Sequence, residues 1–194
     1  MHMNKWIIKS ENELFRKRIF AIKDMVCHHP DKDVTHRFFT LSSPDWINIV
    51  AVTEDGKFIM VRQHRLGTDE ITLETPGGLV EGSESPEETA RRELREETGY
   101  EAGEIHLLKK LTNNPAIFNN HIYFYYAGNC KKIHEQNLDA AEDIEVVTCT
   151  RDEIMDMISN GPIHHTIIVS ALYLYFLSEW SGLVEAAHPF NRLI

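Results

Sequence analysis

The stretch from Gly78 to Tyr100, GLVEGSESPEETARRELREETGY, restricts the fold more than any other part of this chain. Its first half predicts a helix start, with Ser85 at the N-cap, Pro86 at the first helical position and Glu88 completing a capping box. Good helix formers follow, and Gly99 suits the left-handed conformation that often ends a helix. The stretch therefore predicts one helix with a defined beginning and end.

Carboxylates gather on one side of this predicted helix. Glu93 and Glu97 are four residues apart, so they project from the same face, and Glu96 lies beside them. Like charges at this spacing repel, although Arg92 can reach Glu96 and relieve part of the repulsion. Grouped hard oxygen ligands suit Mg²⁺, with Mn²⁺ as an alternative. A solvated acidic helix with ion pairs is the other interpretation, and only the complete spacing of glycines and glutamates favours the metal site.

Composition excludes some classes of function. The 194 residues are 42% hydrophobic and 26% charged, which is typical of a soluble globular protein with one core. The formal net charge of -10 argues against nonspecific binding to DNA or RNA, which requires a basic surface. It does not exclude a phosphorylated substrate, because metal ions neutralise charge locally.

The three cysteines, Cys27, Cys130 and Cys149, show no CxxC spacing, so we expect free thiols in a reducing compartment. No signal peptide pattern is visible, and the longest apolar run, 166–177, is too short for a membrane span. The pair His164-His165 has no second ligand pair at zinc-site spacing. We therefore predict a cytoplasmic protein without a zinc site or membrane contact.

Two domains are predicted. Residues 6–9, 15–25 and 34–41 read as strands of an antiparallel meander, and the polar break after them sets the boundary of an N-terminal strand subdomain at 1–44. Residues 45–194 mix strands with three helices, which predicts an α/β or α+β domain. Its predicted strands are 46–53, 57–63, 72–75, 104–112, 121–128 and 144–148, its second and third helices are 151–159 and 163–180, and 129–143 is a polar, mobile loop.

The whole stretch fits the pattern G-x5-E-x7-R-E-U-x-E-E-x-G-U, where U is a bulky apolar residue. This resembles the signature of the Nudix hydrolases, and Tyr100 in place of an aliphatic residue is a mild departure. The positions that match are Gly78, Glu84, Arg92, Glu93, Leu94, Glu96, Glu97, Gly99 and Tyr100. The resemblance implies an α-β-α sandwich with a mixed sheet and a metal-dependent hydrolysis.

A subfamily is also indicated. The segments 61–65, VRQHR, and 73–78, LETPGG, are similar to the approach to the signature in ADP-ribose pyrophosphatases, and Pro115 lies sixteen residues beyond the last signature glycine. That subfamily implies a homodimer in contact through the N-terminal subdomain. Related nucleoside diphosphate sugar hydrolases carry Asp-x-Lys on the last helix, and residues 163–180 lack it, which favours ADP-ribose over GDP-mannose or UDP-sugars.

The resemblance also implies roles for individual residues. Glu93 and Glu97 would bind metal with the carbonyl of Gly77, with Glu96 close behind, while Arg92 orients the glutamates. We expect Glu97 to be an exposed helix residue whose removal costs little stability.

Substrate contacts are expected outside the helix. Arg65 would meet the pyrophosphate, although a surface arginine at a strand end is the alternative. Glu74 would pair with an arginine or approach the ribose. The base is expected in the loop before the last strand, where Glu142 is the best match and Asp139 and Asp143 are alternatives.

The predicted reaction converts ADP-ribose, or a related nucleoside diphosphate sugar, into a nucleoside monophosphate and a sugar phosphate. A broader hydrolase of GDP-mannose type, a nucleoside triphosphate hydrolase and a non-catalytic ADP-ribose-binding sensor are the alternatives. Trp6, Phe15 or Phe39 would stack on the adenine, or else pack into the core.

Overall fold

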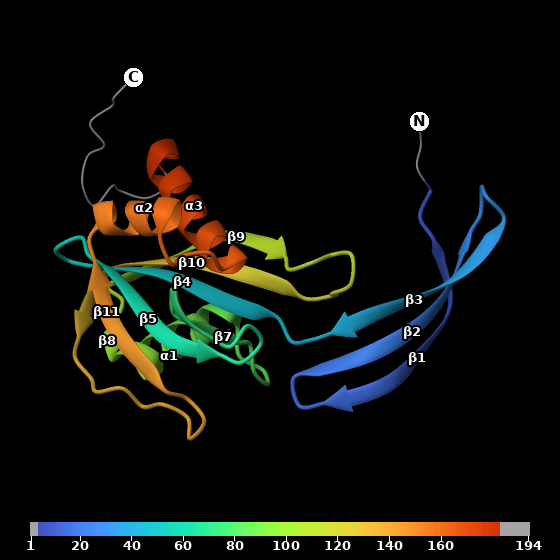
Figure 1. Ribbon diagram of the computed structural model, residues 1–194, viewed down its shortest axis with the longest axis horizontal. Coiled ribbons are helices and arrows are strands. Elements are labelled where there is room, and N and C mark those ends of the chain that lie inside the picture. Colours follow the sequence, from blue (N-terminus) through green and yellow to red (C-terminus); the bar gives the residue numbers. More distant parts are fainter. Residues whose placement is uncertain (1–3, 183–194) are drawn as a thin grey trace. The chain divides into compact units, whose positions relative to one another are not determined.

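The computed structural model describes residues 4–182 (Figure 1). The chain forms two compact units. The first comprises the residues up to Asp45 together with Leu111–Ile122, and the second comprises Trp46–Lys110 with the chain from Tyr123 onward.

The first unit is built on a three-stranded antiparallel sheet. Its strands are β1 (Ile7–Lys17), β2 (Phe20–His29) and β3 (Val34–Ser42), paired in that order. The predicted meander is confirmed, but the predicted strand 15–25 is wrong because the chain turns between Lys17 and Phe20. This turn carries no typical turn residue, since it contains neither glycine, asparagine nor aspartate.

Aromatic side chains of this sheet remain open to solvent within the unit. Trp6, Phe15 and Phe39 are 37%, 44% and 56% exposed. The expectation that they pack into a core is therefore wrong, because a single layer of strands cannot bury both of its faces.

The second unit contains an eight-stranded sheet. Its central order is β11-β5-β4-β10-β8, and β6, β7 and β9 pair with β5, β4 and β10, respectively. The strands are β4 (Trp46–Thr53), β5 (Phe58–Arg65), β6 (Glu70–Glu74), β7 (Gly77–Leu79), β8 (Tyr100–Glu101), β9 (Glu104–Thr112), β10 (His121–Lys132) and β11 (Ile144–Cys149).

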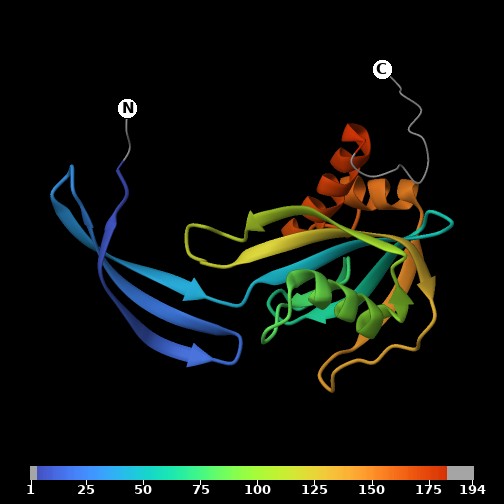
Figure 2. The ribbon, with the colours of Figure 1, turned by 180° about the vertical axis from the view of Figure 1, so that it is seen from behind.

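Three helices cover this sheet, as predicted. They are α1 (Pro86–Thr98), α2 (Arg151–Asn160) and α3 (Thr166–Ser181). Figure 2 shows α1 on one side of the sheet and α2 with α3 on the other, and the view in Figure 1 agrees. The expected α-β-α sandwich is confirmed. None of the helices within 4–182 is long and apolar enough to cross a membrane.

The sheet separates two apolar layers because successive side chains of a strand point to opposite faces. Ile49 and Ala51 of β4 pack in one cluster with Ala90 and Leu94 of α1. On the other face, the rings of Phe58 and Tyr175 lie 5.4 Å apart, edge to face. The signature helix α1 therefore packs on one face of the sheet, and α3 packs on the opposite face.

Several elements differ from the prediction. Strand β7 is absent from the predicted strands because two of its three residues are glycines, but it pairs with β4. Strand β10 continues to Lys132, so the predicted loop starts too early. Helix α3 begins at Thr166 and not at the predicted residue 163, since residues 163–165 are not helical.

Candidate active site

Helix α1 has the predicted caps at both ends. The side chain of Ser85 accepts a hydrogen bond from the backbone N–H of Glu88, whose carboxylate in turn accepts one from the Ser85 N–H. Gly99 adopts φ 75°, and a Cβ atom at this residue would lie 2.2 Å from the carbonyl oxygen of His134. Only glycine satisfies both the conformation and the close approach.

Glu97 lies in the last turn of α1 and is buried, with only 4% of its surface exposed. The expectation of an exposed side chain is wrong, because its Oε2 accepts a hydrogen bond of 3.0 Å from the N–H of Gly77 in β7. Burial raises the pKa of Glu97 to about 8, and the charges of Glu93 and Glu142 add to this effect. The surroundings of Glu97 therefore provide too little positive charge to stabilise its ionised form.

Glu93 lies one turn earlier on the same face of α1 and is close to the strand that precedes the helix. A Cβ atom on Gly78 would lie 2.3 Å from Oε1 of Glu93, so only glycine leaves room for this carboxylate. Burial raises the pKa of Glu93, and the neighbouring Arg92 opposes that shift. Gly78 therefore leaves the space that the side chain of Glu93 needs.

Arg92 connects the glutamates of the signature. Its Nη1 donates to Glu93 at 2.9 Å and to Glu96 at 3.0 Å, while its Nε donates to Glu84 at 3.0 Å. The hydrogen bonds to Glu84 raise the pKa of Arg92, so it stays charged at all ordinary pH values. Because its N–H groups bind three glutamates, Arg92 is better suited to position these carboxylates than to contact a substrate. Sequence reasoning assigned no role to Glu84, although its place in the signature was a signal.

The acidic residues fit a divalent cation that keeps part of its water shell. Two carboxylates on one helix face, the buried Glu97 and the partly buried Glu93, have raised pKa values, which a cation would reverse. Within residues 4–182, no three acidic, histidine or cysteine side chains converge closely enough to enclose an ion by themselves. Mg²⁺ is commonly bound by one or two carboxylates together with waters and substrate phosphates, so this donor set suits it.

Glu142, the predicted base, lies in the loop before β11. Its Oε2 accepts a hydrogen bond of 2.9 Å from the N–H of Asp139, and its charge raises the pKa of both Glu93 and Glu97. The side chain is exposed, as are those of the alternatives Asp139 and Asp143. Among these three, Glu142 is therefore the residue whose charge acts on both carboxylates of α1.

Arg65 and Glu74 form an ion pair between the neighbouring strands β5 and β6. Two guanidinium nitrogens of Arg65 donate to the carboxylate of Glu74 at 2.7 and 2.6 Å, and the hydroxyl of Thr72 donates at 2.6 Å. Burial alone would raise the pKa of Glu74, but these hydrogen bonds outweigh it and hold the pKa below its usual range. The charge of Glu97 also acts on Arg65, so the pair is electrostatically coupled to the carboxylates of α1.

Two supporting contacts were not found from the sequence. Gln136 donates to the carbonyl oxygens of Glu97 and Ile144 at 2.7 and 3.0 Å, which ties the loop before β11 to α1. Thr75 donates to Asn48 at 2.7 Å, which holds the approach to β7 against β4. Gln136 belongs to no motif and lies in the loop predicted to be mobile, whereas Thr75 lies in the segment 73–78 but had no assigned role.

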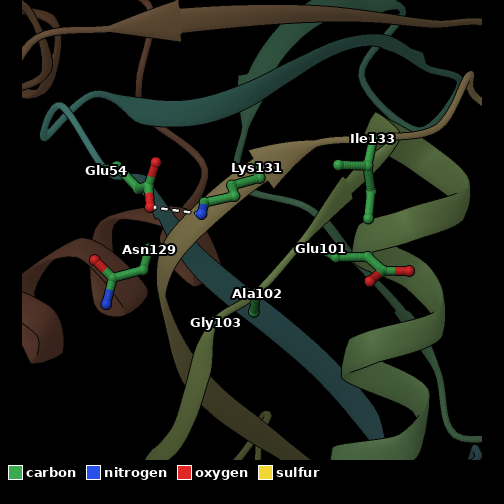
Figure 3. A pocket seen from close by; sticks show the side chains of 7 residues that line it. All are labelled: Glu54, Glu101, Ala102, Gly103, Asn129, Lys131 and Ile133. Atoms are coloured by element: carbon green, nitrogen blue, oxygen red, sulfur yellow. Dashed lines mark ion pairs between the residues drawn. The ribbon is translucent and has the colours of Figure 1, made fainter.

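A surface cavity of about 250 Å³ lies elsewhere in the same unit (Figure 3). In it, Lys131 points toward Glu54 and forms an ion pair of 2.9 Å. The lining residues are Glu54, Glu101, Ala102, Gly103, Asn129, Lys131 and Ile133. None of the predicted site residues lines this cavity, so the candidate site remains the face of α1 that carries the glutamates.

Comparisons with known proteins indicate one family. Residues 44–172 match the family model of the NUDIX domain. The chain is 30% identical to the methanol dehydrogenase activator of Bacillus methanolicus over 173 residues, covering 89% of this chain and 92% of that protein. It is also 30% identical to the ADP-ribose pyrophosphatase of Bacillus subtilis (strain 168) over 137 residues, covering 70% and 74% of the two chains.

A solved structure resembles the whole described fold. The crystal structure of an ADP compounds hydrolase superposes with a TM-score of 0.82 at 25% sequence identity, covering 95% of this chain and 100% of that one. The family model covers more than half of the sequence, and the signature helix lies inside the matched range. This chain therefore belongs to the Nudix hydrolase family.

Proposed function

We propose that the protein hydrolyses the pyrophosphate bond of ADP-ribose or a closely related nucleoside diphosphate sugar. The observation that carries this proposal is a pair of carboxylates on the face of α1 next to the glycines of β7, where Glu97 is buried and Glu93 is partly buried. The relatives named ADP-ribose pyrophosphatase and ADP compounds hydrolase support the substrate class.

In this proposal Glu93, Glu97 and the carbonyl of Gly77 hold Mg²⁺, with Glu96 close by. When bound, the ion polarises a phosphoryl oxygen and neutralises the charge that develops in the transition state. Arg92 keeps the carboxylates in place through its hydrogen bonds to Glu93 and Glu96.

The remaining roles belong to residues around α1. Glu142 takes a proton from the attacking water as the new oxygen–phosphorus bond forms and the bond to the bridging oxygen breaks. Arg65, whose side chain is 47% exposed despite its pair with Glu74, donates to the pyrophosphate with its remaining N–H groups. With ADP-ribose, the products are AMP and ribose 5-phosphate.

Product analysis tests this proposal. ADP-ribose, GDP-mannose, UDP-glucose and a nucleoside triphosphate are each offered with Mg²⁺, and the products are separated by chromatography. We expect the highest kcat/KM for ADP-ribose, with equal amounts of AMP and ribose 5-phosphate. A flat response across the sugars would indicate a broad hydrolase, and release of pyrophosphate from the triphosphate at the highest rate would contradict the proposal.

A regulatory role is the second candidate. One relative, aligned over 89% of this chain, is named as an activator of methanol dehydrogenase. A non-catalytic ADP-ribose sensor belongs to the same regulatory class. Tight binding of ADP-ribose without turnover in the presence of Mg²⁺ would favour the sensor, whereas turnover favours the enzyme. All glutamates of the signature are present, which supports the enzyme.

We also propose a homodimer that forms through the N-terminal sheet, and a cytoplasmic location. The exposed apolar residues of the sheet, including Ile8 at 54% and Phe39 at 56%, support the dimer. The three cysteines are free thiols, which supports a reducing compartment.

A further inference from the structure

A histidine with no assigned role lies beside Glu74. His165 directly precedes α3, and its Nδ1 atom lies 4.0 Å from Oε2 of Glu74. This Nδ1 atom is buried and has no hydrogen-bond partner within residues 4–182, whereas the side chain as a whole is 41% exposed. The imidazole therefore has one nitrogen turned toward the carboxylate, and its remaining surface reaches solvent.

The carboxylate determines which ring nitrogen carries the proton. Burial lowers the pKa of His165, so the ring is neutral near pH 7 and has a single N–H group. The negative charge of Glu74 favours that proton on Nδ1, the nitrogen closer to it. The other nitrogen, Nε2, is then a hydrogen-bond acceptor.

Arg65 shares the same carboxylate. Its Nε and Nη2 atoms bind Glu74, its side chain is 47% exposed, and its charge interacts with that of Glu97. Glu74 therefore has a donor-rich guanidinium and an acceptor-bearing imidazole as neighbours. An ionised phosphate has only acceptors, so it matches Arg65, whereas a hydroxyl can donate to His165.

We propose that Nε2 of His165 accepts a hydrogen bond from a sugar hydroxyl next to the phosphate that Arg65 binds. His165 is then a specificity-determining residue that favours diphosphate esters of sugars over diphosphate esters of simple alcohols. This inference rests on the proposed function, because it assigns the substrate contact of the same site.

Two variants separate this contact from packing. In His165→Asn the side-chain amide reaches the place of Nδ1 but not that of Nε2, whereas in His165→Gln it extends further and can offer an oxygen near Nε2. The neighbouring His164 serves as the control, because it binds Glu70 and the carbonyl of Pro162 instead. Each variant is assayed with ADP-ribose and with the methyl ester of ADP, which has the same diphosphate and no second sugar.

We expect His165→Asn to lower kcat/KM for ADP-ribose about tenfold, mainly through KM, because one hydrogen bond to substrate is lost. The methyl ester should be hydrolysed equally well by this variant and by the wild type. His165→Gln should recover most of the loss, and His164→Asn should behave as the wild type with both compounds. Equal losses on both compounds, or no loss on either, would overturn the inference.

The proposed function is judged separately, by whether the wild type hydrolyses ADP-ribose at all. If it does not, calorimetric Kd values for the same two compounds replace kcat/KM. A tenfold weaker Kd for ADP-ribose alone in His165→Asn still supports the sugar contact. An unchanged ratio of the two Kd values refutes it.

Discussion

At the scale of single residues, the site depends on carboxylates that are held near one another against their own repulsion. Arg92 is the cation that makes this possible in the described structure, since it binds Glu84, Glu93 and Glu96 at once. Glu84 binds the side of the guanidinium that faces away from the proposed metal ligands. We therefore expect Glu84 to limit the competition between Arg92 and a metal ion for Glu93.

Glu84→Gln tests this role. Without the charge of Glu84, Arg92 pairs more strongly with Glu93, so we expect the Mg²⁺ concentration for half-maximal activity to rise roughly 10- to 100-fold. The rate at saturating Mg²⁺ should change much less. Glu87→Gln is the control, because Glu87 pairs with Arg91 at the surface of the same helix. An unchanged Mg²⁺ requirement in Glu84→Gln would contradict the assignment.

Glu74 gives a prediction about pH and stability. Its pKa in the folded protein lies below the usual value of 4.5, so the pair with Arg65 stabilises the fold above pH 4.5 and loses this effect as the pH falls through the lowered pKa. We expect Glu74→Gln to lower the free energy of unfolding by about 1–3 kcal/mol near neutral pH, and by progressively less in acid.

Urea unfolding at several pH values measures this difference. Glu145→Gln provides the control, because Glu145 forms a solvent-exposed pair with Arg62 at 3.2 Å. The control should change stability by less than about 1 kcal/mol. A difference between wild type and Glu74→Gln that stays constant down to strongly acidic pH would show that the pair is not responsible.

At the scale of elements, helix α1 depends on how it ends. Gly99 needs its glycine for a φ of 75° and for the approach of the His134 carbonyl, whereas Gly82 has a φ of 56° and open space around its Cα. We expect Gly82→Ala to cost about 1–2 kcal/mol of stability from backbone strain alone. Gly99→Ala should cost clearly more, because its methyl group would also displace backbone. Thermal unfolding of both variants checks this order, and equal losses would contradict it.

The signature helix was predictable from sequence because its information is local. Ser85, Pro86 and Gly99 determine its ends within one continuous stretch, and the structure has those ends. The hairpin turn between β1 and β2 was not predictable, because apolar Ile19 continues the alternation through the turn. Burial of Glu97 was also missed, since it depends on β7, a strand too short and too rich in glycine to predict.

The other contacts that were not predicted from the sequence join segments that are far apart along the chain. His165 and Glu74 are far apart in sequence, and only the fold brings Nδ1 to 4.0 Å from the carboxylate. Gln136 likewise reaches α1 from a loop that carries no motif. Pairing with an arginine was among the alternatives for Glu74, but the sequence could not name Arg65 as the partner, because the strand register sets Arg65 opposite Glu70 and Glu74 opposite Val61.

At the scale of the whole molecule, the N-terminal unit exposes apolar side chains on a single-layered sheet, and we attribute this to dimer formation. We expect sedimentation equilibrium to give twice the mass of one chain. Phe39→Ser, on β3, should weaken the dimer, whereas Leu66→Ser should not, although Leu66 is 85% exposed in the second unit. A monomeric wild type at micromolar concentration would contradict the proposal.

The central claim is that the carboxylates of α1 support metal-dependent hydrolysis of a pyrophosphate bond. The most direct test measures AMP formation from ADP-ribose, at increasing Mg²⁺, in the wild type, Glu97→Gln and the control Glu87→Gln. We expect AMP and ribose 5-phosphate from the wild type and the control. Glu97→Gln should lose at least about 100-fold in rate while it keeps a cooperative unfolding transition. Turnover by Glu97→Gln near the wild-type rate, or wild-type turnover that is independent of Mg²⁺, would contradict the claim.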